Sequence, residues 1–343
     1  MYEAILKRSY LVIALNIYMK LLKPGTVLFL MLTAIFASGQ EINNTSSFRT
    51  INGERYFRFH YENDFFTAAD YYYSQGIQLE MVNPALKKIT PLKVLLHLPS
   101  ASYKYGLSVE HEAYTPSSIR HNEILDHDRP FAVTLSLKTF LISIDTLRLQ
   151  RISASLTGGI IGPAAGGEWM QKSIHKWLHN IEPLGWQNQV RNDVILSYNI
   201  AYEKKLLSAG HYLLLNNYAT INAGTLKNNV GIGAVLMLGS FDSPFSSSNA
   251  RSYSHSNFQF HFYTQPLVSF IAYDATLQGG VFNHNEPYSI PANKISRLTF
   301  QNNFGLVVSI RKIYLEYFQS ILSKEFTEGR YHRFGGVRIG IAF

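Results

Sequence analysis

The sequence predicts an all-β protein, a single transmembrane antiparallel β-barrel of about twelve strands. Three features predict it: segments in which apolar and polar residues alternate, a short apolar tract near the amino terminus, and a last strand that ends in an aromatic residue. Only alternate residues of a barrel strand face lipid. A content of 46% hydrophobic residues therefore fits a barrel better than a helical membrane protein.

The amino terminus predicts export. An apolar stretch over residues 27–36 follows Lys20 and Lys23 and precedes small residues at 37–39, which is the order of a secretory signal. The stretch is about half of the roughly 20 apolar residues that a spanning helix needs. We therefore expect a signal peptide over residues 1–39 and the barrel over residues 40–343. The segment from Met19 onward forms a complete signal by itself, which predicts that translation starts at Met19.

Alternation with a period of two recurs along the rest of the chain. Ile77, Leu79 and Met81, for example, form an apolar row with polar residues between them. An even number of strands puts both ends on one side of the membrane. If the ends are periplasmic, the connections at 63–74, 111–129 and 159–192 lie outside the cell. The expected strands cover residues 55–63, 77–81, 105–110, 131–138, 147–158, 196–203, 213–223, 228–241, 258–274, 294–310, 313–322 and 337–343.

The last strand has an ending that resembles that of bacterial outer-membrane barrels. Its apolar face alternates with small or polar residues and reaches an aromatic last residue. This resemblance implies an outer-membrane location, contact with outer-membrane lipids and recognition by the barrel insertion machinery. The residues of this face are Val337, Ile339, Ile341 and Phe343.

One helix is predicted, over residues 168–179 in the third outer connection. This stretch lacks Gly and Pro, and apolar residues recur in it at helical spacing. Its other face carries Gln171 and His175, which lie four positions apart and therefore stack on one side.

Composition limits the classes of partner that the chain is expected to bind. The chain has 31 basic and 23 acidic residues, and a net charge of +8 suits either nucleic acid or an anionic lipid surface. Export disfavours nucleic acid. The absence of cysteine excludes disulfides and thiolate chemistry.

Polar side chains gather where the first two expected strands meet. The first strand ends in Glu62, Asn63 and Asp64, and the second begins near Asp70 and Ser74. Hard oxygen ligands in this number suit calcium. The same residues also suit an ordinary polar turn. His175 is likewise either a general base or a plain histidine on a helix surface.

Motifs in these connections resemble the lipid A 3'-O-deacylase family. The shared blocks are Glu62-Asn63-Asp64, Tyr73-Ser74-Gln75-Gly76, Tyr114-Thr115-Pro116, Asp128-Arg129-Pro130, Gly162-Pro163, Gly166-Gly167, Gln171, His175 and Gly185-Trp186-Gln187-Asn188-Gln189. The resemblance implies a twelve-stranded outer-membrane barrel that hydrolyses the ester of the 3'-linked acyl chains of lipid A, or lipopolysaccharide, with Ca²⁺, at a site that faces the cell exterior.

Residue roles follow from the same resemblance. His175 would be the general base, while Asn63 and Asp64 would hold the calcium that polarises the ester carbonyl. Ser74 stands where the family commonly has Thr, so the catalytic hydroxyl is kept. A lysine that some members carry in the second outer loop has no match, and Arg120 is the candidate substitute.

Further residues are candidate substrate contacts. They are Gln171, Lys172 and Trp186. Trp186 suits either a seat for an acyl chain or an aromatic residue at the membrane interface. Lys172, together with Lys176, Arg129 and Arg191, suits either contact with lipid A phosphates or solvated loop charge.

Two other functions stay open. The first is a related barrel esterase that acts on glycerophospholipid. The second is a passive pore, because inward-facing charges are compatible with either a packed interior or a wet channel. Those charges are Glu80, Glu110, Lys138 and Glu316. A serine hydrolase is disfavoured, since no nucleophile elbow is present.

Overall fold

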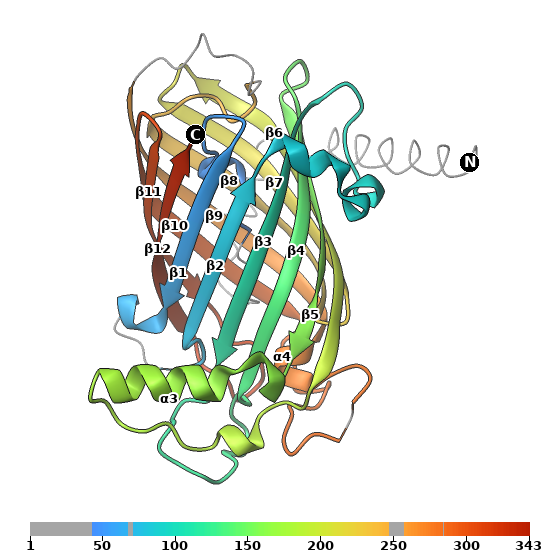
Figure 1. Cartoon of the computed structure of the whole chain (residues 1–343), viewed down its shortest axis with the longest axis vertical. Coiled ribbons are helices and arrows are strands. Elements are labelled where there is room, and N and C mark those ends of the chain that lie inside the picture. The colour runs from blue at the N-terminus through green and yellow to red at the C-terminus, as the bar shows by residue number, and fades with distance from the viewer. Residues whose placement is uncertain (1–42, 68–70, 247–256, 284) are drawn as a thin grey trace, which may run out of the picture. The chain divides into compact units, whose positions relative to one another are not determined.

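The structure is a closed antiparallel barrel of twelve strands (Figure 1). It is a computed structural model, and it describes residues 43–67, 71–246, 257–283 and 285–343. Each strand pairs with its neighbours in sequence, and β1 closes the barrel against β12. The predicted fold class is confirmed. The expected signal peptide over residues 1–39 lies outside the described residues.

The strands follow one another with short helices between them. The strands are β1 (Tyr56–Asn63), β2 (Gln75–Val82), β3 (Ser102–Tyr114), β4 (Ala132–Asp145), β5 (Gln150–Ile161), β6 (Asp193–Ala209), β7 (Leu213–Gly224), β8 (Lys227–Ser240), β9 (Phe258–Asp274), β10 (Leu298–Ile310), β11 (Ile313–Leu322) and β12 (His332–Ala342). The α-helices are α3 (Gly167–Trp177) and α4 (Ala275–Gln278). The 3-10 helices are η1 (Ser47–Arg49), η2 (Asp64–Thr67), η3 (Pro84–Lys88), η4 (Thr90–Val94), η5 (Pro163–Ala165) and η6 (Trp186–Asn188).

Burial alternates along the strands, as the sequence pattern predicted. In β11, Tyr314, Glu316 and Phe318 point into the barrel and are almost completely buried. Ile313 and Leu315 lie between or beside them on the outer face and are exposed. The outer face is apolar because it meets lipid, whereas the inner face carries both aromatic and charged residues.

The second half of β4 departs from the expected pattern. Its strand was predicted to end near residue 138, but it continues to Asp145 with nearly every residue buried. The outer face of β4 and β5 is covered here, because Leu92 and Leu95 pack against Leu141 and Ala154. A strand that is buried on both faces has no polar row, so the alternation disappears from the sequence.

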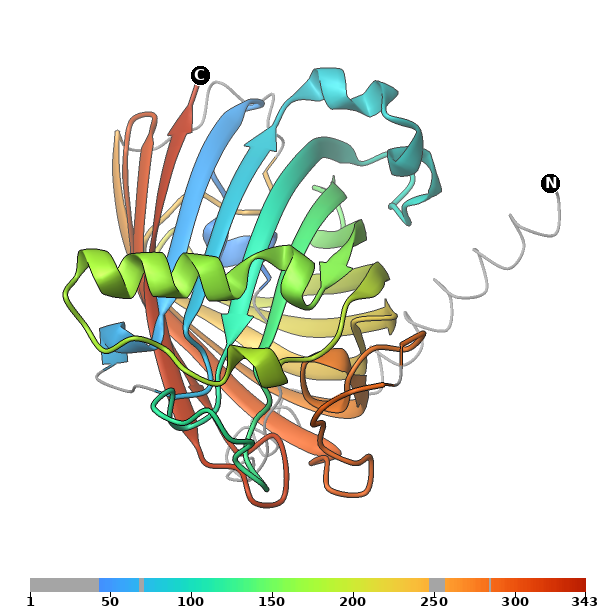
Figure 2. The ribbon, with the colours of Figure 1, turned by 60° about the horizontal axis from the view of Figure 1, so that its bottom comes forward.

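Helix α3 confirms the helix predicted over residues 168–179. It lies at the end of the barrel where β1, β3 and β5 finish (Figures 1 and 2). Within the described ranges, no helix has the length and apolar character required to cross a membrane.

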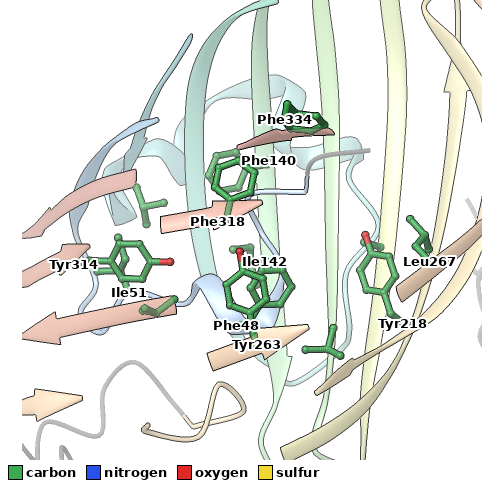
Figure 3. Close-up of a cluster of buried hydrophobic side chains, with 14 of the residues drawn as sticks. Phe48, Ile51, Phe140, Ile142, Tyr218, Tyr263, Leu267, Tyr314, Phe318 and Phe334 are labelled. Atoms are coloured by element: carbon green, nitrogen blue, oxygen red, sulfur yellow. The ribbon is translucent and has the colours of Figure 1, made fainter. Parts of the chain in front are cut away.

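A segment that precedes β1 fills the barrel lumen. We call residues 43–51 the lumen segment; it contains η1, and Phe48, Arg49 and Ile51 are almost completely buried. The ring of Phe48 stacks on that of Tyr263 in β9, with the ring centroids 3.9 Å apart (Figure 3). Aromatic stacking of this kind adds to the burial of apolar area.

Cations of the barrel wall hold the backbone of the lumen segment. Arg58 donates to the carbonyl oxygens of Asn44 and Arg49 at 2.7 and 3.0 Å, and Lys104 donates to that of Ile51 at 2.8 Å. Hydrogen bonds from charged donors are stronger than neutral ones. Since Arg58 lies on β1 and Lys104 on β3, the segment is fixed to several strands at once.

A buried ion cluster completes this attachment. Glu316 of β11 accepts from Arg49 at 3.0 Å and from Arg338 of β12 at 2.9 Å. Arg338 also donates to the side chain of Asn44 at 2.9 Å. Buried charges are tolerated when they are paired and hydrogen-bonded in this way. Between the lumen segment and the α3 end, a polar cavity of about 140 Å³ remains.

Candidate active site

The first candidate residues lie where β1 turns toward β2. Pairing of Glu62 with Gly76 brings the two strands together at this end. Asn63 donates from Nδ2 to the carbonyl oxygen of Ser74 and accepts at Oδ1 from the N–H of Phe65 at 2.8 Å. Asn63 therefore ties together the two sides of the connection.

Helix α3 can approach this rim because two glycines start it. Gly166 has a φ of 79°, in the left-handed region that glycine adopts without strain. At Gly167, an added Cβ would lie 2.9 Å from Val133 and 3.0 Å from Trp186. Only glycine lets the first turn of the helix lie this close to β4.

A chain of hydrogen bonds joins α3 to the β1–β2 rim. Trp186 Nε1 donates to Gln171 Oε1 at 2.7 Å, and Gln171 Nε2 lies 3.5 Å from Ser74 Oγ, which is a long hydrogen bond. Ser74 Oγ in turn lies 2.8 Å from Thr115 Oγ1. Four of the predicted site residues, Asn63, Ser74, Gln171 and Trp186, are thus connected.

His175 lies one helical turn beyond Gln171 and on the same side of α3. Its Nδ1 is 2.6 Å from the carbonyl oxygen of Ile181. A carbonyl can only accept, so Nδ1 is the ring nitrogen that donates in this contact. Nε2 is therefore the ring nitrogen that this contact leaves unused.

The last turn of α3 and Asp64 lie at the same end of the barrel. Asp64 is the first residue of η2 and is 5% exposed. In both views of the ribbon, the carboxyl end of α3 lies beside η2 (Figures 1 and 2). His175 and Asp64 thus lie at the same end of the barrel. Their predicted catalytic roles stay predictions.

Two predicted substrate contacts lie away from this chain of hydrogen bonds. Arg120 is exposed, and its backbone N–H is 3.3 Å from Ser118 Oγ. Lys172 forms ion pairs with Glu168 at 3.0 Å and Glu182 at 3.7 Å. The hydrogen bond from Lys172 to Glu168 raises the pKa of the Lys172 ammonium, so the side chain stays charged at neutral pH.

Trp186 and Arg129 are buried. Trp186 is 1% exposed and packs against Phe131, with ring centroids 4.8 Å apart. Its burial and its hydrogen bond to Gln171 indicate that Trp186 supports the site. Contact of Trp186 with an acyl chain stays a prediction. Arg129 is ion-paired with Glu325 and lies over the ring of Tyr114, so its charge is already compensated.

Sequence reasoning assigned no role to two residues that support the site. Thr115 is 3% exposed and shares a hydrogen bond with Ser74. Gln75 donates from Nε2 to the sulfur of Met170 and so holds the inner face of α3. Thr115 and Gln75 both lie within the motifs quoted above, and that position was the sequence signal that could have identified them.

The oxygen donors at this rim fit a hard cation. They are the carboxylate of Asp64, the amide oxygen of Asn63, the hydroxyls of Ser74 and Thr67, and backbone carbonyls. Calcium accepts such a mixed set. In the part of the chain that the structure describes, no three His, Asp or Glu side chains gather as a metal-binding group.

The fold defines an outer-membrane β-barrel with a helix and polar loops at one rim. Comparison of the sequence with known families matches residues 26–343 to the family described as outer membrane protein LpxR. The match spans most of the chain, so the chain belongs to this family. Membership supports an outer-membrane enzyme that acts on lipid A.

One solved structure supports this fold. The chain is similar to LpxR from Salmonella typhimurium, with 18% identity, a TM-score of 0.67, and coverage of 84% of this chain and 100% of that one. It also matches the β domain of the Bordetella autotransporter BrkA at 6% identity and a TM-score of 0.43, over 85% of this chain and 100% of that one. No curated protein matches the sequence.

Proposed function

We propose that this protein is a calcium-dependent lipid A 3'-O-deacylase whose site faces the cell exterior. In this reaction, Nε2 of His175 takes a proton from water, and the water oxygen forms a bond to the ester carbonyl carbon. The bond from that carbon to the sugar oxygen then breaks, and the proton passes to the sugar oxygen. The products are a free fatty acid and a lipid with a new hydroxyl group.

Asn63 and Asp64 would hold the calcium, which when bound polarises the ester carbonyl and stabilises the oxyanion. Ser74 and Gln171 position the helix and its imidazole against the rim. The observation that carries the proposal is the link between Gln171 and Ser74, because it ties the helix with the base to the connection with the acidic residue.

The test is lipid A mass spectrometry after expression in a host that lacks the enzyme. We expect wild type to remove the 3'-linked acyl chains, and His175→Ala or a calcium chelator to abolish the removal. His179→Asn is a matched control, because His179 is an exposed histidine just beyond α3 with a φ of 54°, which Asn tolerates. Full activity of His175→Ala would overturn the proposal.

The substrate class has its own test. A related barrel esterase would cleave glycerophospholipid, so purified protein is given both lipids in mixed micelles. Release of fatty acid from lipid A alone is the expected result. Cleavage of phospholipid with lipid A left intact would contradict the proposed substrate.

A further inference from the structure

Helix α3 has a second face that points away from the barrel. Successive residues of an α-helix are turned by about 100°, so residues opposite Gln171 lie on the far side from the rim. Trp169 and Trp177 are 73% and 78% exposed, although tryptophan is mostly buried in proteins. Trp169, Ser173 and Lys176 lie most nearly opposite Gln171, and Lys172 and Trp177 lie at the edges of this outward face.

This face lies at the depth of a lipid headgroup layer. The exposed apolar row of β2 runs through Met81 and Leu79 and ends at Ile77. Gln75, which contacts Met170 of α3, lies two residues farther along the strand. Two residues of strand span about 7 Å. The headgroup layer on each side of a bilayer core is about 5–8 Å thick, so α3 begins within that layer.

The chemistry of the face suits that position. Tryptophan is enriched at membrane interfaces, where its ring meets the acyl boundary and its N–H meets polar groups. Lysines beside it attract phosphate-bearing lipids. Lys172 is paired with acidic neighbours, whereas Lys176 makes no ion pair within the described ranges. The charge of Lys176 is therefore available for an ion pair with an anionic lipid.

We propose that the outward face of α3 is an anchor in the outer leaflet, with its tryptophans at the acyl boundary and Lys176 on the phosphate of an anionic lipid. The anchor presses the helix against the rim from the lipid side. It rests on the outer-membrane location of the barrel and on the proposed exterior position of the α3 end, and it does not depend on the proposed hydrolysis.

Tryptophan fluorescence tests the anchor directly. The chain has three tryptophans, and the third, Trp186, is buried. The difference in emission between wild type and the double variant Trp169→Phe, Trp177→Phe therefore reports on the outward face. In vesicles whose lipids carry bromine near the carbonyl end of the acyl chains, we expect most of this difference emission to be quenched. Quenching by aqueous acrylamide with no effect of bromine would overturn the proposal.

A second measurement tests the role of the charge. Vesicles of brominated phosphatidylcholine are compared with and without brominated phosphatidylglycerol. We expect the anionic lipid to increase quenching in wild type, and Lys176→Gln to lose most of that increase. Lys312→Gln is the matched control, because Lys312 is an exposed lysine in the turn between β10 and β11, at the opposite end of the barrel. Equal quenching in both vesicle types would contradict the assignment to anionic lipid.

The variant His175→Ala distinguishes a failure of the proposed anchor from a failure of the proposed hydrolase activity. His175→Ala should show the same quenching as wild type, since His175 lies on the Gln171 side of α3 and not among the outward-facing residues. Loss of deacylation with quenching unchanged would count against neither the anchor nor its lipid. Loss of quenching in His175→Ala would show that the imidazole, and not the outward face, holds the helix, and would overturn the anchor.

Discussion

At the scale of single residues, the site depends on one hydroxyl group. Ser74 Oγ meets Thr115 at 2.8 Å and Gln171 at 3.5 Å. Ser74→Ala removes both contacts, and we expect the rate of deacylation to fall roughly fivefold, because a hydrogen bond contributes about 1 kcal/mol. Ser74→Thr keeps the hydroxyl and should retain most of the rate. Equal rates for the two variants, measured by lipid A mass spectrometry, would show that the hydroxyl is not needed.

A substitution at Trp186 can distinguish a supporting role of this residue from direct contact with an acyl chain. Trp186→Phe keeps an aromatic ring against Phe131 but removes the N–H that donates to Gln171. If the residue only supports Gln171, kcat should fall severalfold while KM stays constant. Kinetics on lipid A in micelles measure both constants. A rise in KM alone would instead favour a seat for the acyl chain.

At the scale of elements, the sequence allowed the strands and α3 to be predicted because their patterns are local. Alternation of apolar and polar residues over a short stretch predicts a strand with a lipid face, and apolar residues at helical spacing predict α3. The site was reached only through a family resemblance, because Ser74 and Gln171 are 97 positions apart and nothing local links them. Arg49 and Glu316 are 267 positions apart, and the lumen segment has no period, so this segment was not predicted.

The lumen segment should contribute to stability through Arg49. Arg49→Met removes the bond to Glu316 and leaves Glu316 with Arg338. Breaking a buried ion pair costs about 3–5 kcal/mol, and the remaining arginine should keep the loss near the lower value. The free energy of unfolding in urea, measured on the protein in detergent micelles, checks this. Lys312→Met, at an exposed turn, is the control and should change it little. Equal stability of both variants would show that Arg49 is dispensable.

At the scale of the whole molecule, the barrel wall separates an inner surface, which faces the lumen, from an outer surface, which faces lipid. The inside is occupied by the lumen segment, which contacts β1, β3, β9, β11 and β12. The proposed chemistry lies at the rim between the wall and α3, and the proposed anchor puts the exposed face of α3 on the lipid side. A substrate that is itself a membrane lipid can therefore reach the site from the leaflet without entering the lumen.

The packed middle of the lumen argues against the passive pore that the sequence left open. We expect the wild-type protein to show no steady conductance in planar bilayers, because aromatic and ion-paired side chains fill the middle of the barrel. Deletion of residues 43–51 should open a conducting path, since it removes the segment and leaves the twelve strands intact. A folded barrel migrates faster than the unfolded chain on an unheated gel, which checks that the deletion variant has folded. If it does not fold, Phe48→Gly with Arg49→Gly loosens the same packing. Steady conductance of the wild type would show that the lumen is open in the membrane.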